Sequence, residues 1–219
     1  MQKFDTPAPI AAVLNIPAGR VQFIAADRAD TTVEVLPANP SKSRDTKAAE
    51  QTTVAYADGV LRIHAPEPKN QLVGPSGSLE ITVQLPAGSR IEAKAASAEL
   101  RAVGRLGDVA FDGAYRQIKI DEAASVRLTA TDGDVEVGRL GGPAEISTAR
   151  GDIRIAEAVR GKVVLRTQSG DISVAAAVSA SLDAGTSYGR ISNDLKNDGT
   201  PELDIHATTS QGDITARSL

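Results

Sequence analysis

The sequence predicts an all-β protein, and within that class a single-stranded β-helix (β-solenoid) wound from coils of about 18 residues. Three observations predict this fold. A Gly-Asp-Ile/Val tripeptide recurs along the chain, alternating apolar and polar residues flank each copy, and the apolar residues are mostly small or branched aliphatic ones. Aromatic residues make up 3% of the chain and tryptophan is absent, which favours a narrow core.

The tripeptide supplies the register of the repeat. The complete copies are Gly133-Asp134-Val135, Gly151-Asp152-Ile153, Gly170-Asp171-Ile172 and Gly212-Asp213-Ile214. Degenerate copies are Glu99-Leu100, Gln117-Ile118 and Arg190-Ile191. The apolar members, with spacings of 18, 17, 18, 19, 19 and 23 residues, are Leu100, Ile118, Val135, Ile153, Ile172, Ile191 and Ile214. Stacking would place these side chains about 4.8 Å apart in one ladder.

Each coil is predicted to contain two short strands. Nine residues before the first five ladder members lie the apolar residues Ile91, Val109, Val126, Ala144 and Val163. Alternation within 126–137 puts the apolar side chains of both strands on one face. A third short side is indicated by Leu106, Leu140, Val159 and Val178. The glycine of the tripeptide supplies a turn with positive φ and the aspartate accepts backbone N–H groups, so Gly151→Val or Gly170→Val is expected to reduce stability.

Residues 1–90 are predicted to form a β-rich N-terminal part and cap that is continuous with the solenoid, and residues 91–219 the β-helix coils. Expected strands in the first part are 12–16, 21–24, 32–36, 60–63 and 79–83. The near-copies Ile16-Pro17-Ala18-Gly19 and Leu85-Pro86-Ala87-Gly88 suggest a looser version of the same winding. Polar stretches at 38–45 and 66–70, and the longer spacings near Tyr188 and 193–201, predict exposed loops.

Composition and charge exclude several classes of function. The net charge of −4 argues against nucleic-acid binding, and the absence of cysteine excludes thiol chemistry and disulfides. No stretch approaches 18 apolar residues, so no direct membrane insertion is expected. The start of the chain lacks the features of a signal peptide, so the sequence predicts a cytoplasmic protein if Met1 is the native start.

The repeats Thr148-Ala149-Arg150-Gly151-Asp152-Ile153-Arg154-Ile155 and Thr167-Gln168-Ser169-Gly170-Asp171-Ile172-Ser173-Val174 share the pattern Thr/Ser-x-x-Gly-Asp-Ile-x-Val. This pattern resembles the bacterial β-strand-repeat proteins labelled "putative adhesin", and the resemblance covers nearly the whole chain. It implies a right-handed β-helix without an assigned biochemical function. The family has no catalytic residues that could be carried over.

The sequence predicts no catalytic residues and no cofactor. His64 and His206 lie outside any metal or hydrolase motif and are interpreted as surface histidines. Residues 138–143 are interpreted as a corner, and the oxygen-rich stretch 193–199 as a plain turn. The sharpest metal candidates are Asp134, Asp152 and Asp171, which occupy equivalent positions in consecutive coils. This row could hold Ca²⁺, or it could consist of turn carboxylates satisfied by backbone amides, which we favour.

Three functions stay open. The favoured one is a non-enzymatic binding or scaffold protein that presents a rigid surface to an unknown protein or cell-envelope partner. A self-assembling β-helix polymer is the alternative, since open coil ends could form a homo-oligomer. A carbohydrate-active enzyme is the third, and its basis is analogy between folds.

Overall fold

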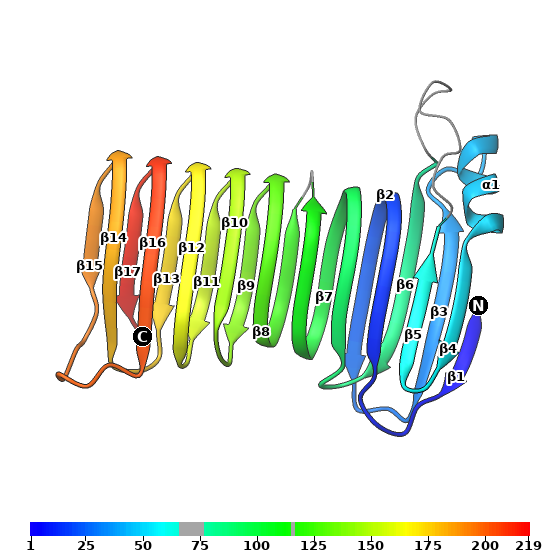
Figure 1. Ribbon diagram of the computed structural model, residues 1–219, viewed down its shortest axis with the longest axis horizontal. Coiled ribbons are helices and arrows are strands. Elements are labelled where there is room, and N and C mark those ends of the chain that lie inside the picture. The colour runs from blue at the N-terminus through cyan, green and yellow to red at the C-terminus, as the bar shows by residue number, and fades with distance from the viewer. Residues whose placement is uncertain (66–76, 115–116) are drawn as a thin grey trace.

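The computed structural model describes residues 1–65, 77–114 and 117–219, which form an all-β chain with one helix (Figure 1). The described strands join one long sheet that winds into a stack of coils. In chain order the elements are β1 (Gln2–Asp5), β2 (Ala11–Ala26), β3 (Asp30–Pro37), α1 (Ser43–Gln51), β4 (Thr53–Ala57), β5 (Val60–His64), β6 (Leu79–Pro86), β7 (Arg90–Ala114), β8 (Ile118–Asp132), β9 (Val135–Leu140), β10 (Ala144–Arg150), β11 (Ile153–Ala158), β12 (Gly161–Ser169), β13 (Ile172–Ala176), β14 (Ala180–Tyr188), β15 (Ile191–Asp194), β16 (Leu203–Gln211) and β17 (Ile214–Ser218). The loop predicted at 66–70 lies outside the described residues.

The middle of the stack follows the predicted repeat. On one side of the core β8, β10 and β12 pair in parallel, and on the other side β9, β11 and β13 do the same. Each strand lies beside the equivalent strand of the next coil, so Val135 is in register with Ile153 and Ile153 with Ile172. This is the solenoid-like stacking that the tripeptide spacing predicts.

Ladders of aliphatic side chains fill the core. Leu100, Ile118, Val135, Ile153 and Ile172 are at most 1% exposed, and each such side chain contributes about 1.5–3 kcal/mol through burial. The third side is formed by the row Leu106, Ala123, Leu140, Ala158 and Ala176. Two members predicted for this side, Val159 and Val178, lie just beyond that row and are half-buried.

The order of the coils at the C-terminal end differs from their order in the sequence. β16 pairs with β12 on one side and β14 on the other, and β17 lies between β13 and β15 in the same way. The last coil of the chain therefore lies inside the stack, and the coil before it forms the end (Figure 1). The long spacing between Ile191 and Ile214 follows from this, because the extra residues return the chain past β14. Ile191 ends the ladder and is 47% exposed.

A similar reversal occurs at the N-terminal end. β2 is one complete coil, in parallel register with β7 on one side and with β5 and β6 on the other. Beyond it the predicted looser winding is wrong, because β1, β3 and β4 run antiparallel to their neighbours. The prediction of an exposed loop at 38–45 is also wrong for its last three residues, because α1 begins at Ser43. Asp45 in this helix is buried and accepts the backbone N–H of Ser78 over 3.0 Å.

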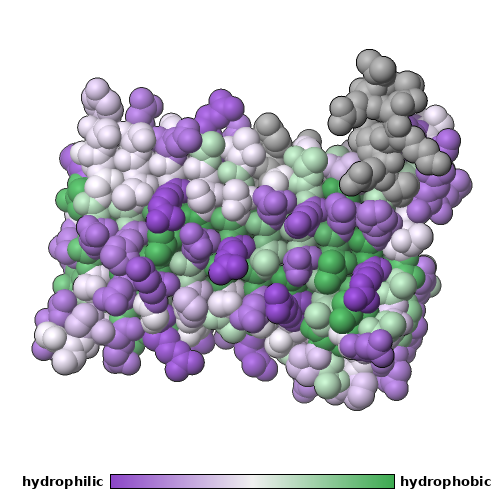
Figure 2. All heavy atoms as spheres, in the orientation of Figure 1, coloured by the Kyte–Doolittle hydropathy of each residue, from purple (hydrophilic) through white to green (hydrophobic). Residues whose placement is uncertain are grey.

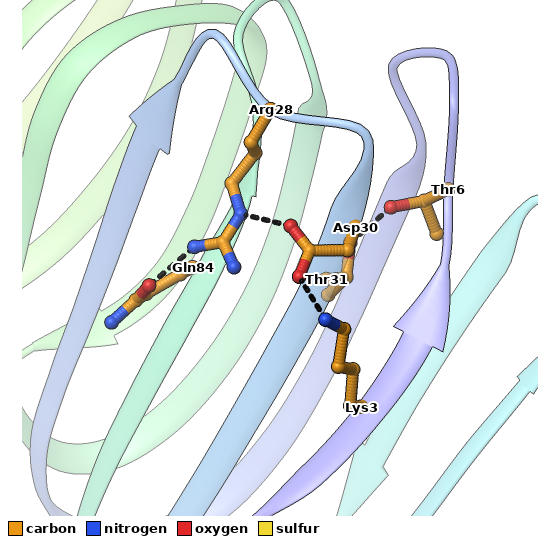
Figure 3. A network of polar contacts seen from close by, with 6 residues as sticks. All are labelled: Lys3, Thr6, Arg28, Asp30, Thr31 and Gln84. Atoms are coloured by element: carbon orange, nitrogen blue, oxygen red, sulfur yellow. Dashed lines mark hydrogen bonds and ion pairs between the residues drawn. The ribbon is translucent and has the colours of Figure 1, made fainter.

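A network of polar contacts joins strands of this N-terminal cap (Figure 3). The carboxylate of Asp30 accepts hydrogen bonds from Arg28 over 2.8 Å and from Lys3 over 3.0 Å, and Arg28 also reaches Gln84. Arg28 and then Lys3 lower the pKa of Asp30 to about 2. Nearby, the buried hydroxyl groups of Thr6 and Thr31 are hydrogen-bonded, and the rings of Phe4 and Tyr56 pack at 5.6 Å.

Candidate functional site

The Gly-Asp corners form a continuous ladder of hydrogen bonds along one edge of the stack. The backbone N–H of Asp152 donates to Oδ1 of Asp134 over 2.9 Å, and Asp171 donates to Asp152 over 2.7 Å in the same way. The series continues to Asp213 and ends at Arg190, whose backbone N–H and guanidinium lower the pKa of Asp213. One oxygen of each of these aspartates is therefore used by the winding of the chain.

The glycine and the threonine of the motif have structural roles as well. Gly151 has φ of +127°, and a Cβ atom there would lie 2.3 Å from the carbonyl oxygen of Gly133 in the neighbouring coil. The nearly buried hydroxyl of Thr167 donates to the carbonyl of Gly151 over 3.2 Å, and Thr209 donates to Gly170 over 3.1 Å. The glycine, the aspartate and the hydroxyl groups of Thr167 and Thr209 thus join adjacent coils, whereas the hydroxyl of Thr148 donates to Arg150 in its own coil.

This geometry bears on the calcium candidates. A cation bound along Asp134, Asp152 and Asp171 would find mainly their second carboxylate oxygens, whereas Ca²⁺ takes six to eight oxygen ligands. Over residues 1–65, 77–114 and 117–219, no three His, Cys, Asp or Glu side chains are grouped as ligands of a metal ion. Calcium binding by this row stays a prediction for titration to test.

The two histidines lie far apart in the stack. His64 is exposed on β5 in the N-terminal part, whereas His206 lies half-buried on β16 near the other end (Figure 1). Nδ1 of His206 is 3.2 Å from Oδ2 of Asp183 on the adjacent strand β14. The separation of the two elements prevents the histidines from sharing one catalytic or metal site.

The other two predicted stretches also serve the backbone. Residues 138–143 span the end of β9 and the turn before β10, as expected for a corner. In the 193–199 stretch, the hydroxyl of Ser179 donates to Asp198 over 2.7 Å and lowers the pKa of that carboxyl group. Asp198 also accepts the backbone N–H of Thr200 over 3.1 Å, so its oxygens stabilise a turn.

A groove on the outer surface is the candidate binding site. It has a volume of about 460 Å³ and crosses the strands β7, β8, β10 and β12. The charged residues along it are the cations Arg90, Arg127, Lys162 and Arg166 and the carboxylates Asp108 and Glu145. The groove has two more cationic than anionic groups, in a chain whose net charge is −4. The groove is therefore locally cationic.

The cationic side chains are only loosely neutralised. Glu145 lies 4.0 Å from Arg127 and 3.6 Å from Arg166, and these arginines are 83% and 57% exposed. Exposed pairs at such distances contribute about 0–1 kcal/mol, so an incoming carboxylate can compete for both guanidinium groups. The registered neighbours Ala110 and Val164 are short, half-buried residues that add apolar surface to the lining.

The sequence did not reveal this groove, because its cations occupy different positions within their coils. Lys162 and Arg166 come from one strand, Arg127 from another and Arg90 from the start of a third. Reading one repeat position at a time gives mixed charges. A usable signal would have been the outward positions of the first strand of each coil, taken together across five neighbouring coils.

Comparison with known proteins places the chain in a family. A family model described as Toastrack DUF4097 matches residues 13–218. The chain belongs to the Toastrack family. This match supports the resemblance inferred from the repeats, while the curated proteins contain no match to the Toastrack chain.

Solved structures similar to this Toastrack chain include a "putative cell adhesion protein" from Clostridium sporogenes, with 12% identity, a TM-score of 0.41 and coverage of 100% of this chain and 98% of that one. A "putative adhesin" from Bacteroides fragilis has 13% identity and a TM-score of 0.47, covering 98% and 95% of the two chains. Another from Parabacteroides distasonis has 13% identity, a TM-score of 0.43 and the same coverage. The family assignment rests on the family model.

In the part of the Toastrack chain that the structure describes, no helix is long and apolar enough to cross a membrane. The lining of its charged groove combines arginine, lysine, two carboxylates, Ser125 and small apolar side chains. The arrangement can bind and orient an anionic ligand by charge and hydrogen bonds.

Proposed function

We propose that this Toastrack protein is a non-enzymatic binding protein whose groove holds an extended, acidic segment of a protein partner. The observation that supports this most strongly is the excess of cationic side chains along a groove in a rigid sheet surface. Because parallel strands on both sides of the core fix the backbone, the cations are anchored on a surface that changes little on binding. Preorganisation of this kind reduces the entropic cost of association.

Two features favour a peptide over a sugar or nucleic acid. Among the described residues, the groove lining contains no aromatic side chain on which a sugar ring or a base could stack. The overall charge of −4 also opposes a long polyanion, which would extend past the groove. A short acidic segment needs only the local positive charge.

The alternative of a self-assembling polymer has less support, because the outer strands β1, β3 and β4 at the N-terminal end run antiparallel to their neighbours and do not continue the parallel coils of the stack. An enzyme acting on carbohydrate would need a positioned acid or base, and the two carboxylates of the groove contact Ser125, Arg127 and Arg166. The proposal also includes the right-handed winding that parallel connections favour.

A binding assay with a labelled hexaglutamate peptide tests this proposal. We expect fluorescence anisotropy to detect binding that weakens between about 50 and 300 mM salt, since exposed charges are screened over about a Debye length. The double variant Arg127→Ala/Arg166→Ala should bind about tenfold more weakly, from two contacts of about 0.5–1 kcal/mol each. Arg154→Ala, an exposed arginine on β11, is the matched control and should bind normally.

The result that would overturn the proposal is hexaglutamate binding that the double variant leaves unchanged, or no binding by the native protein. Equal binding of hexalysine would also count against it, because the groove then could not be selecting negative charge. A parallel arm uses polygalacturonate. If this glycan binds through Arg127 and Arg166 while hexaglutamate does not, the acidic-peptide proposal is replaced by a glycan-binding one.

A further inference from the structure

The two ends of the stack are built differently. At the N-terminal end the outer strands β1, β3 and β4 run antiparallel to their neighbours, and α1 packs on β3 and β6. At the other end, within the described part of the chain, β14 pairs only with β16 and β15 only with β17. One edge of each of these strands therefore has backbone N–H and C=O groups without a strand partner, which is the usual template for adding another strand.

Apolar side chains accompany these open edges. Ile191 on β15 is 47% exposed and Tyr188 at the end of β14 is 76% exposed, although Ile191 continues the ladder that is buried elsewhere. Leu182 and Leu195 pack partly against the core at the same end. Figure 2 shows hydrophobic surface reaching the end of the stack where β14 and β15 lie. This end combines open strands with an exposed section of the core.

We propose that this C-terminal end binds the same end of a second copy through a two-fold axis, with β14 antiparallel to β14 of the other copy. A single peptide could satisfy one edge but would leave the second strand and the apolar section between them uncovered. The matching end of a second copy presents both strands with the same separation. Because a two-fold contact uses the same end of both copies, assembly stops at a dimer.

The charges of β14 fit this antiparallel arrangement. Asp183 lies in the first half of the strand and Arg190 just beyond its end, with side chains that are 83% and 90% exposed. Antiparallel pairing centred between Thr186 and Ser187 brings Asp183 of one copy opposite Arg190 of the other, twice per dimer. Parallel addition of the same strand would instead place like charges side by side.

The size of the surface sets the expected strength. A nine-residue strand is about 30 Å long, and two strands with a packed core between them are about 15–20 Å across. Each copy would bury about 500 Å², or about 1,000 Å² in total, at the lower limit for a specific interface. We therefore expect a reversible dimer that forms at micromolar or higher concentration.

Sedimentation equilibrium over about 1–500 μM protein tests the proposal. The mass should rise from 22.7 kDa to about twice that value and then stop rising. Ile191→Lys places a charge in the proposed contact and should shift the transition at least tenfold upward in concentration. Thr208→Lys is the matched control, because Thr208 is exposed on β16, one coil inside the end, and should leave the transition in place.

A charge exchange tests the two-fold axis itself. Asp183→Arg and Arg190→Asp should each weaken the dimer, and the double variant should restore it because the opposite charges again meet. Arg190 also contacts Asp213 at 3.3 Å, so thermal unfolding of each variant checks that the end coil stays folded. A protein that is monomeric throughout, that grows without limit, or whose dimer tolerates Ile191→Lys overturns the proposal. So does a double variant as weak as the single ones while folded.

Discussion

The substitution Gly151→Ala tests whether close approach of neighbouring coils explains the repeated glycine. The added Cβ would lie 2.3 Å from the carbonyl oxygen of Gly133, so the two coils must separate by roughly 1 Å to restore a normal contact. Hydrogen bonds at this corner run from the backbone N–H of Gly133 to the carbonyl of Arg150 and from that of Asp152 to Asp134, each over 2.9 Å, and separation of these two coils would weaken both.

The cost can be estimated from these two effects. A non-glycine residue held at φ of +127° costs about 1–3 kcal/mol, and two weakened hydrogen bonds cost about 0.5–1.5 kcal/mol each. Together they predict that Gly151→Ala lowers the free energy of unfolding by about 2–6 kcal/mol. Gly199→Ala is the matched control. Gly199 also has a positive φ of +96°, but no atom lies within 4 Å of the position that a Cβ would take. This variant should therefore cost only about 1–2 kcal/mol of backbone strain.

Urea unfolding followed by far-UV circular dichroism measures both variants against the native protein. Because stacked repeats can unfold in steps, the comparison uses the midpoint and slope of each transition as well as the fitted free energy. If Gly151→Ala costs no more than Gly199→Ala, contact between coils does not explain the glycine, and the corner geometry would need another account.

Three further predictions concern single side chains. Thr167→Val removes the donor to the Gly151 carbonyl and should cost about 1 kcal/mol in urea unfolding, whereas Thr129→Val on the exposed surface should be nearly neutral; equal effects would contradict the assigned role. Asp152→Asn keeps an oxygen that accepts the N–H of Asp171 but removes the charge repulsion between Asp152 and the neighbouring aspartates Asp134 and Asp171. At low salt the variant should be as stable as the native protein or more stable by up to about 1 kcal/mol, and clear destabilisation would refute this. The lowered pKa of Asp30, about 2, contributes stability that is present above about pH 4 and lost as pH falls toward 2. The thermal midpoint of Asp30→Asn should therefore lie below that of the native protein at pH 6 and meet it near pH 2, and a gap that persists at pH 2 would contradict the ion-pair explanation.

Much of the central stack could be predicted from sequence because local constraints repeat there. A glycine with positive φ, an aspartate that binds the next coil and an aliphatic residue with a fixed neighbour recur at nearly constant spacing. The all-β class, the parallel stacking and the burial of residues such as Ile153 follow from that pattern. The helix α1 escaped prediction because Ala48 and Ala49 are its only apolar residues, and the contact between Asp45 and Ser78 joins residues 33 positions apart in the chain.

The groove was less predictable for a different physical reason. Inward residues repeat because each must pack on the equivalent residue of the next coil, but outward residues meet only solvent and neighbours on the same surface. Arg127, Glu145 and Val164 are in register and yet chemically unrelated. A site formed by such a row has no repeat signature, so it requires knowledge of which outward positions lie side by side.

The order of the coils shows where repeat regularity itself limits inference. Coils of similar sequence offer similar strand edges. The hydrogen bonds between strands would therefore be nearly the same whether the last coil of the chain lay at the end of the stack or one position inside it. The difference comes from the connections, since the 23-residue step to Ile214 is long enough for the chain to return past β14. Insertion gives the last coil partners on both sides and leaves the open edges to β14 and β15, which the chain holds at both of their ends. The surface proposed for dimer formation is therefore anchored by covalent connections and does not fray as a free chain terminus would.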